Sequence, residues 1–245
     1  MPETSRSITT YISIMLLLTV ATQIFYIATL GGVGIVEGWP LRSTLWTAEI
    51  LLFTGITIAA LVALVRSPAV PWGWAALVVA GAINIVQSGI GLSMFLPAAK
   101  AGPEFAPLMG TLLAGSFLFY NLAKAIIGLA ALLFGLSLFR SDKTKVRAIG
   151  LISMVAGAIA MILNIAAVYL GLGAVPFSGA SGAVATFLQA AQSGFPLLAQ
   201  AETASLLRRD ETLGDQTSWQ RENLPLNLGA GYRLDIATLI AQEPR

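Results

Sequence analysis

Two ionisable side chains interrupt long apolar stretches of this sequence. Glu49 lies within STLWTAEILLFTGITIAALVALV, and Lys124 lies within SFLFYNLAKAIIGLAALLFG. A charged side chain at the centre of a bilayer costs about 2.5 to 3.5 kcal/mol on insertion scales, so such a residue is expected to have a partner or a task. The two can bind an anionic group or relay a proton. Alternatively, they form an interior ion pair that only holds helices together.

Amide side chains accompany these two residues at helical spacing. Asn121 precedes Lys124 by one turn of a helix, and Asn84 stands in the same relation to Gln87. Amides on an inward helix face hydrogen-bond to neighbouring helices or to a bound solute. Gln23 and Gln189 offer further amides to the same interior. The candidate solute-binding residues are therefore Lys124, Glu49, Asn121, Asn84, Gln87, Asn164 and Gln192.

The residue types that are missing restrict the chemistry. The sequence has no histidine and no cysteine. These residues are the usual ligands of haem, iron–sulfur clusters, zinc and copper, and they are essential to thiol and Ser-His-Asp catalysis. We therefore predict that the protein is not an enzyme and that it needs no cofactor. No basic run indicates binding to nucleic acid, and the net charge is only +2.

The amino-acid composition is typical of a protein that is embedded in a membrane. The chain is 56% hydrophobic and 11% charged, with a mean hydropathy of +0.81. Soluble domains carry about 25% charged residues. Because the apolar segments are long and do not alternate with polar residues, they predict helices rather than the strands of a barrel. The expected fold class is an all-α integral membrane protein.

The apolar segments predict a bundle of six transmembrane helices over residues 1–200. A span needs about 20 apolar residues. The last predicted span is the weakest, because it contains Gln189, Gln192 and Pro196. Residues 201–245 are polar and predict a short cytoplasmic tail. The spans are expected near 9–30, 45–65, 73–97, 109–139, 148–172 and 182–200.

An internal repeat is suggested by two segments that align without gaps. FYNLAKAIIGLAALLFGLSLFRSD at 119–142 aligns with FLQAAQSGFPLLAQAETASLLRRD at 187–210, which places Gln192 opposite Lys124. A similar segment, LVALVRSP at 61–68, extends the set to the second span. We interpret the chain as three helical hairpins in parallel orientation.

Charges in the connections predict the orientation in the membrane. One side holds Arg6, Arg66, Arg208, Arg209 and the cations of 140–147, whereas the other side holds only Arg42 and Lys100. By the positive-inside rule, both termini are cytoplasmic, and we expect a multi-pass protein of the inner (plasma) membrane. The aromatic residues near the span ends are expected to form interfacial belts: Tyr11, Trp39, Trp46, Trp72 and Trp74.

Two functions fit this organisation. The first is a carrier or channel for a small polar or anionic solute, with its site near Lys124 and Glu49. The second is a non-catalytic membrane subunit or scaffold, in which the buried polar residues only hold the bundle together. Its expected partners are membrane lipids and a protein that contacts the C-terminal tail.

Overall fold

The computed structural model describes residues 3–66, 70–171, 175, 178 and 180–191. These residues all belong to the compact unit Met1–Ala199. Their elements are helices, and no strand occurs among them. In chain order the labelled elements are α1 (Glu3–Leu30), α2 (Trp39–Arg66), α3 (Pro71–Ile90), the π-helical turn η1 (Gly91–Phe95), α4 (Leu96–Lys100), the 3-10 turn η2 (Pro103–Phe105), α5 (Ala106–Phe139) and α6 (Thr144–Leu170).

Five helical stretches are long and apolar enough to cross a membrane, in agreement with the first five predicted spans. They are Ser7–Leu30, Trp39–Arg66, Pro71–Lys100, Pro103–Phe139 and Thr144–Leu170. The third continues through η1 and α4 without leaving the helical path.

The second stretch begins at Trp39 rather than at residue 45. Pro40 fits its first turn because the backbone N–H of that turn has no helical partner in any case.

The sixth predicted span is described only in part. Ala180–Ala191 is an apolar helix, shorter than a bilayer crossing requires. The remainder of 182–200 and the predicted tail at 201–245 lie outside the described residues. The count of six helices and the threefold hairpin repeat therefore stay predictions.

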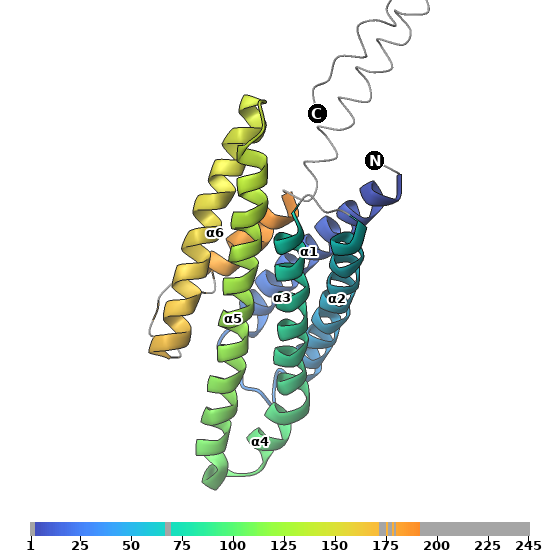
Figure 1. The fold of residues 1–245 in the computed structure, drawn as a ribbon. Coiled ribbons are helices and arrows are strands. Elements are labelled where there is room, and N and C mark those ends of the chain that lie inside the picture. Colours follow the sequence, from blue (N-terminus) through green and yellow to red (C-terminus); the bar gives the residue numbers. More distant parts are fainter. Residues whose placement is uncertain (1–2, 67–69, 172–174, 176–177, 179, 192–245) are drawn as a thin grey trace, which may run out of the picture. The chain divides into compact units, whose positions relative to one another are not determined.

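The helices pack as neighbours in a bundle (Figure 1). α5 lies beside both α3 and α6, α2 packs on α3, and α1 packs on α2. The main core lies between α1, α2, α3 and α5, and its large fully buried side chains include Ile12, Leu16, Phe53, Ile56 and Leu77. This arrangement also brings buried polar residues from the same four helices into the interior of the bundle.

Helices α5 and α6 approach each other backbone to backbone. A Cβ added to Gly128 would lie 2.7 Å from the carbonyl oxygen of Gly157, and one added to Gly157 would lie 2.5 Å from that of Gly128. Gly135 and Gly150 face each other in the same way about two helical turns away, with a Cβ on Gly135 2.8 Å from the Gly150 oxygen. Small residues at such a contact allow extensive van der Waals packing, the main attraction between apolar helices in lipid.

Two of the predicted belt aromatics are buried instead. Trp46 is 7% exposed and Trp74 is 4% exposed, whereas Trp72 is 77% exposed. Trp74 meets the ring of Phe134 edge-on at a centroid distance of 4.6 Å. Both tryptophans lie on inward helix faces, so ring packing determines their position and the belt interpretation is wrong for them.

Candidate functional site

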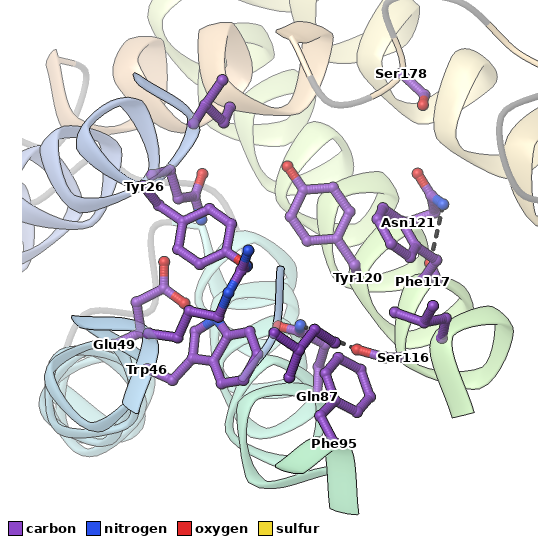
Figure 2. A pocket seen from close by; sticks show the side chains of 15 residues that line it. Tyr26, Trp46, Glu49, Gln87, Phe95, Ser116, Phe117, Tyr120, Asn121 and Ser178 are labelled. Carbon is purple, nitrogen blue, oxygen red and sulfur yellow. Dashed lines mark hydrogen bonds between the residues drawn. The ribbon is translucent and has the colours of Figure 1, made fainter. Parts of the chain in front are cut away.

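A cavity of about 530 Å³ opens between α1, α2, α3, η1 and α5 (Figure 2). Its wall combines aromatic rings, amides, hydroxyls and two charged side chains. The residues that line it are Gln23, Tyr26, Ile27, Ile35, Arg42, Trp46, Glu49, Gln87, Phe95, Leu113, Ser116, Phe117, Tyr120, Asn121 and Ser178. Its size is that of a small-molecule site rather than of a packing defect.

Aromatic rings build one side of this cavity. Trp46 stacks on Tyr26 with ring centroids 6.0 Å apart and meets Phe95 edge-on at 5.6 Å. The ring of Trp46 fits here because Gly91 has no side chain, and a Cβ there would lie 3.0 Å from it. Gly91 also begins the π-helical turn η1, which ends at Phe95. Such turns often occur at functional sites because they redirect side chains.

Glu49 lies on the cavity wall one helical turn after Trp46. It is 9% exposed, so its carboxylate is largely shielded from water. Lys124 interacts with it electrostatically. Figure 2 shows Glu49 and Trp46 on one side of the cavity, with Tyr120 and Asn121 on the other. A carboxylate in this position can carry charge into the site or hold a proton.

Lys124 lies behind the cavity rather than on its wall. It is 0% exposed, and its Nζ donates a hydrogen bond of 3.1 Å to Oε1 of Gln23. The same Nζ lies 5.3 Å from the centroid of Tyr120 and 5.9 Å from that of Phe53. Gln23 does line the cavity, so this hydrogen bond connects Lys124 to a residue of the cavity wall.

Gly182 leaves the space that the lysine stem needs. A Cβ on Gly182 would lie 2.7 Å from Cγ of Lys124. The helix Ala180–Ala191 thus covers the aliphatic part of Lys124, and burial of this residue depends on a glycine far away in the sequence.

The predicted amides divide into two groups. Gln87 and Asn121 line the cavity, and Nε2 of Gln87 donates to the hydroxyl of Ser116 at 3.2 Å. Asn121 donates to the carbonyl of Phe117 at 2.9 Å, and its Oδ1 is buried without a hydrogen-bond partner among the described residues. Both side chains are part of the cavity wall, and the NH₂ groups of both donate to other groups of the protein.

The other predicted amides lie away from the cavity. Asn84 donates to the carbonyl of Ala80 at 2.8 Å, and Asn164 donates to that of Ala160 at 2.7 Å and to Ser181 Oγ at 3.2 Å. The first bond stays within α3, and the last joins α6 to the helix Ala180–Ala191. Gln192 lies outside the described residues.

Arg42 lines the cavity, whereas the positive-inside rule predicted only that it lies on the outer side. It is 7% exposed, and its guanidinium donates to the carbonyls of Leu30 at 3.2 Å and Val33 at 2.6 Å, and to the Tyr26 hydroxyl. A signal was available, because Arg42, Trp46 and Glu49 follow helical steps of four and three. The guanidinium therefore links α2 to the end of α1 and to the connection that follows it. It also contributes a positive charge to the cavity.

Comparison of the chain with protein-family models, with curated proteins and with solved structures finds no match. Within the described residues, no group of three or more acidic, histidine or cysteine side chains is placed to hold a metal ion. The cavity wall has the groups that small-molecule sites use for binding: two opposite charges, several hydrogen-bonding groups and aromatic rings.

Proposed function

We propose that this chain is a multi-pass membrane protein that binds a small solute in the cavity between its helices and acts as its carrier or channel. The observation that supports this most is the cavity of about 530 Å³ that contains Glu49 and Arg42 inside a bundle of apolar helices. Charged residues inside spans usually face a binding site or a pathway, because their cost must be offset there. The solute would lie between the helices in this cavity, whereas Lys124 would orient Gln23.

We further propose an inner-membrane location with cytoplasmic termini, built from three helical hairpins. The hairpins would pair α1 with α2, α3 with α5, and α6 with the segment that begins at residue 180. The bias of cations toward one set of connections supports this orientation. The tail would remain available to a protein partner, and the apolar outer faces would contact lipid.

The orientation can be tested with single cysteines, since the natural chain has none. Glu104→Cys lies in the connection before α5, and Asp142→Cys lies in the connection after it; both positions are exposed. A membrane-impermeant thiol reagent should label Glu104→Cys in intact cells or spheroplasts. It should label Asp142→Cys only after the membrane is opened. The reverse pattern would contradict the proposed orientation, and labelling of both in intact cells would contradict a span between them.

Filling the cavity tests whether it binds a solute. Leu113 lines it and the adjacent Leu112 does not, so Leu113→Trp and Leu112→Trp form a matched pair. Compounds of different charge class are screened for a rise in the unfolding midpoint of the purified protein in detergent. A compound that binds the cavity should stabilise the parent and Leu112→Trp, but not Leu113→Trp. If every stabilising compound acts equally on both variants, binding lies elsewhere and the proposal fails.

The alternative, a non-catalytic scaffold, is favoured by one group of observations. Asn84 and Asn164 bond within the bundle, and Lys124 bonds to Gln23 rather than to a group on an open wall. Polar bonds of this kind hold helices together, at about 0.6 to 2 kcal/mol each. Under this alternative, no compound stabilises the parent, and Leu113→Trp leaves the protein as stable as before.

A further inference from the structure

Among the residues that the structure describes, the charges around the cavity are not balanced. Glu49 is the acidic residue on its wall, whereas Arg42 lies on the wall and Lys124 lies directly behind Gln23. Glu37, the acid in the connection before α2, is exposed and accepts a hydrogen bond from the Gly34 amide at 3.3 Å. The electrostatic interaction between Lys124 and Glu49 leaves the charge of Arg42 in excess. Buried charges without a counter-charge are costly, so an anion would complete this site.

The hydrogen-bond partners of Arg42 within the described residues are all neutral. They are the Tyr26 hydroxyl and two backbone carbonyls, and its Nε is buried without a hydrogen-bond partner in the part of the chain that is described. A guanidinium with neutral partners keeps its full positive charge and can still attract a carboxylate.

Lys124 determines which end of the Gln23 amide is left for a ligand. An ammonium group can only donate hydrogen bonds, so the atom of Gln23 that faces Lys124 must be the oxygen, Oε1. The amide NH₂ group is then the part of Gln23 that remains for the cavity. Gln23 lies one helical turn before Tyr26, whose hydroxyl contacts Arg42. The donors of Gln23 and the guanidinium of Arg42 therefore lie near the same part of the cavity.

We propose that the cavity binds an amphipathic organic carboxylate. Its head group would be held by the Gln23 amide and the Arg42 guanidinium, and its apolar part by the aromatic wall around Trp46. Lys124 would be a positioning residue, because it keeps the Gln23 amide turned as a donor. This inference rests on the proposed function, since it names the solute class for the same cavity.

The test uses probes that share a body and differ in the head group. 3-Phenylpropionate, 3-phenylpropionamide and 3-phenylpropan-1-amine are titrated against the purified full chain in detergent, with the unfolding midpoint as readout. Palmitate and hexadecylamine form a second set, which distinguishes an acid drawn from the bilayer from one drawn from water. At least one carboxylate should raise the midpoint, whereas its matched amine and amide should not. Leu113→Trp should abolish this effect.

Gln23→Glu provides the sharpest variant. It keeps an oxygen acceptor for Lys124, so the fold should be retained, but it replaces the NH₂ donors by a second carboxylate. The affinity for the carboxylate should fall about tenfold or more, because a charge-assisted hydrogen bond is lost and a repulsion is added. Gln87→Glu serves as the matched control, since Gln87 lines the cavity without contacting Lys124. A smaller loss there is expected.

The outcomes separate the two proposals. If the amines stabilise the protein as well as the acids, or if neither acid does, the carboxylate inference is overturned. If a compound of another class is blocked by Leu113→Trp, the cavity still binds a solute and the proposed function survives. If Gln23→Glu binds the acid as tightly as the parent, the assigned role of Gln23 and Lys124 is wrong.

Discussion

Lys124→Met is expected to lower the free energy of unfolding by about 3 kcal/mol, and adding Glu49→Gln is expected to restore most of that loss. Methionine keeps an unbranched apolar side chain beside Gly182 but removes the ammonium. Oε1 of Gln23 then loses its donor, and the carboxylate of Glu49, which is 9% exposed, loses its electrostatic partner. Equilibrium unfolding of the purified protein in mixed detergent micelles measures both effects.

The double-mutant cycle distinguishes interacting charges from independent ones. Glu49→Gln alone should also destabilise the protein, because it leaves Lys124 charged and fully buried. If the two single effects add within about 0.5 kcal/mol, the residues do not interact and the pairing is refuted. Lys100→Met, at an exposed position, is the control for the general effect of removing a cation and should change stability little.

Gly157→Leu is expected to separate α5 from α6 and to lower the free energy of unfolding by about 3 kcal/mol or more. A Cβ on Gly157 would lie 2.5 Å from the carbonyl oxygen of Gly128 and 2.7 Å from the backbone nitrogen of Leu132. Backbone atoms cannot rotate away as a flexible side chain can, so the helices must move apart. Thermal unfolding in detergent, followed by circular dichroism, checks the loss.

The control for this prediction is a glycine in an open position. Gly110→Leu on α5 meets no atom within 4 Å of its new Cβ. Leucine also has a higher helix propensity than glycine, so this variant should be as stable as the parent or more so. Equal destabilisation by the two substitutions would show that the close contact between α5 and α6 contributes nothing specific.

The local sequence pattern was sufficient to predict the five long helices and many of their inward-facing residues. The five long helices match the apolar stretches, because burying a backbone in an apolar environment requires internal hydrogen bonds over a minimum length. The spacing of Asn121 and Lys124 correctly indicated an inward face, since helical periodicity is a property of the chain itself.

Helical periodicity was insufficient to predict which side chains contact each other between helices. It placed Lys124 and Glu49 in one interior, but it could not show that Lys124 bonds to Gln23 across a separation of 101 residues. It also could not predict that Trp46 and Trp74 turn inward, because the rotation and axial position of each helix depend on how its neighbours pack.

The sequence by itself determined that this is a helical, strongly apolar protein without histidine or cysteine, with rare polar groups on inward helix faces. Only the tertiary structure decided which of these groups reach a common space. Glu49, Gln87 and Asn121 line the cavity and Arg42 joins them, whereas Lys124 lies behind Gln23. The physical reason is that a helix face is set by local geometry, whereas a cavity exists only where side chains from several helices fail to fill the space between them.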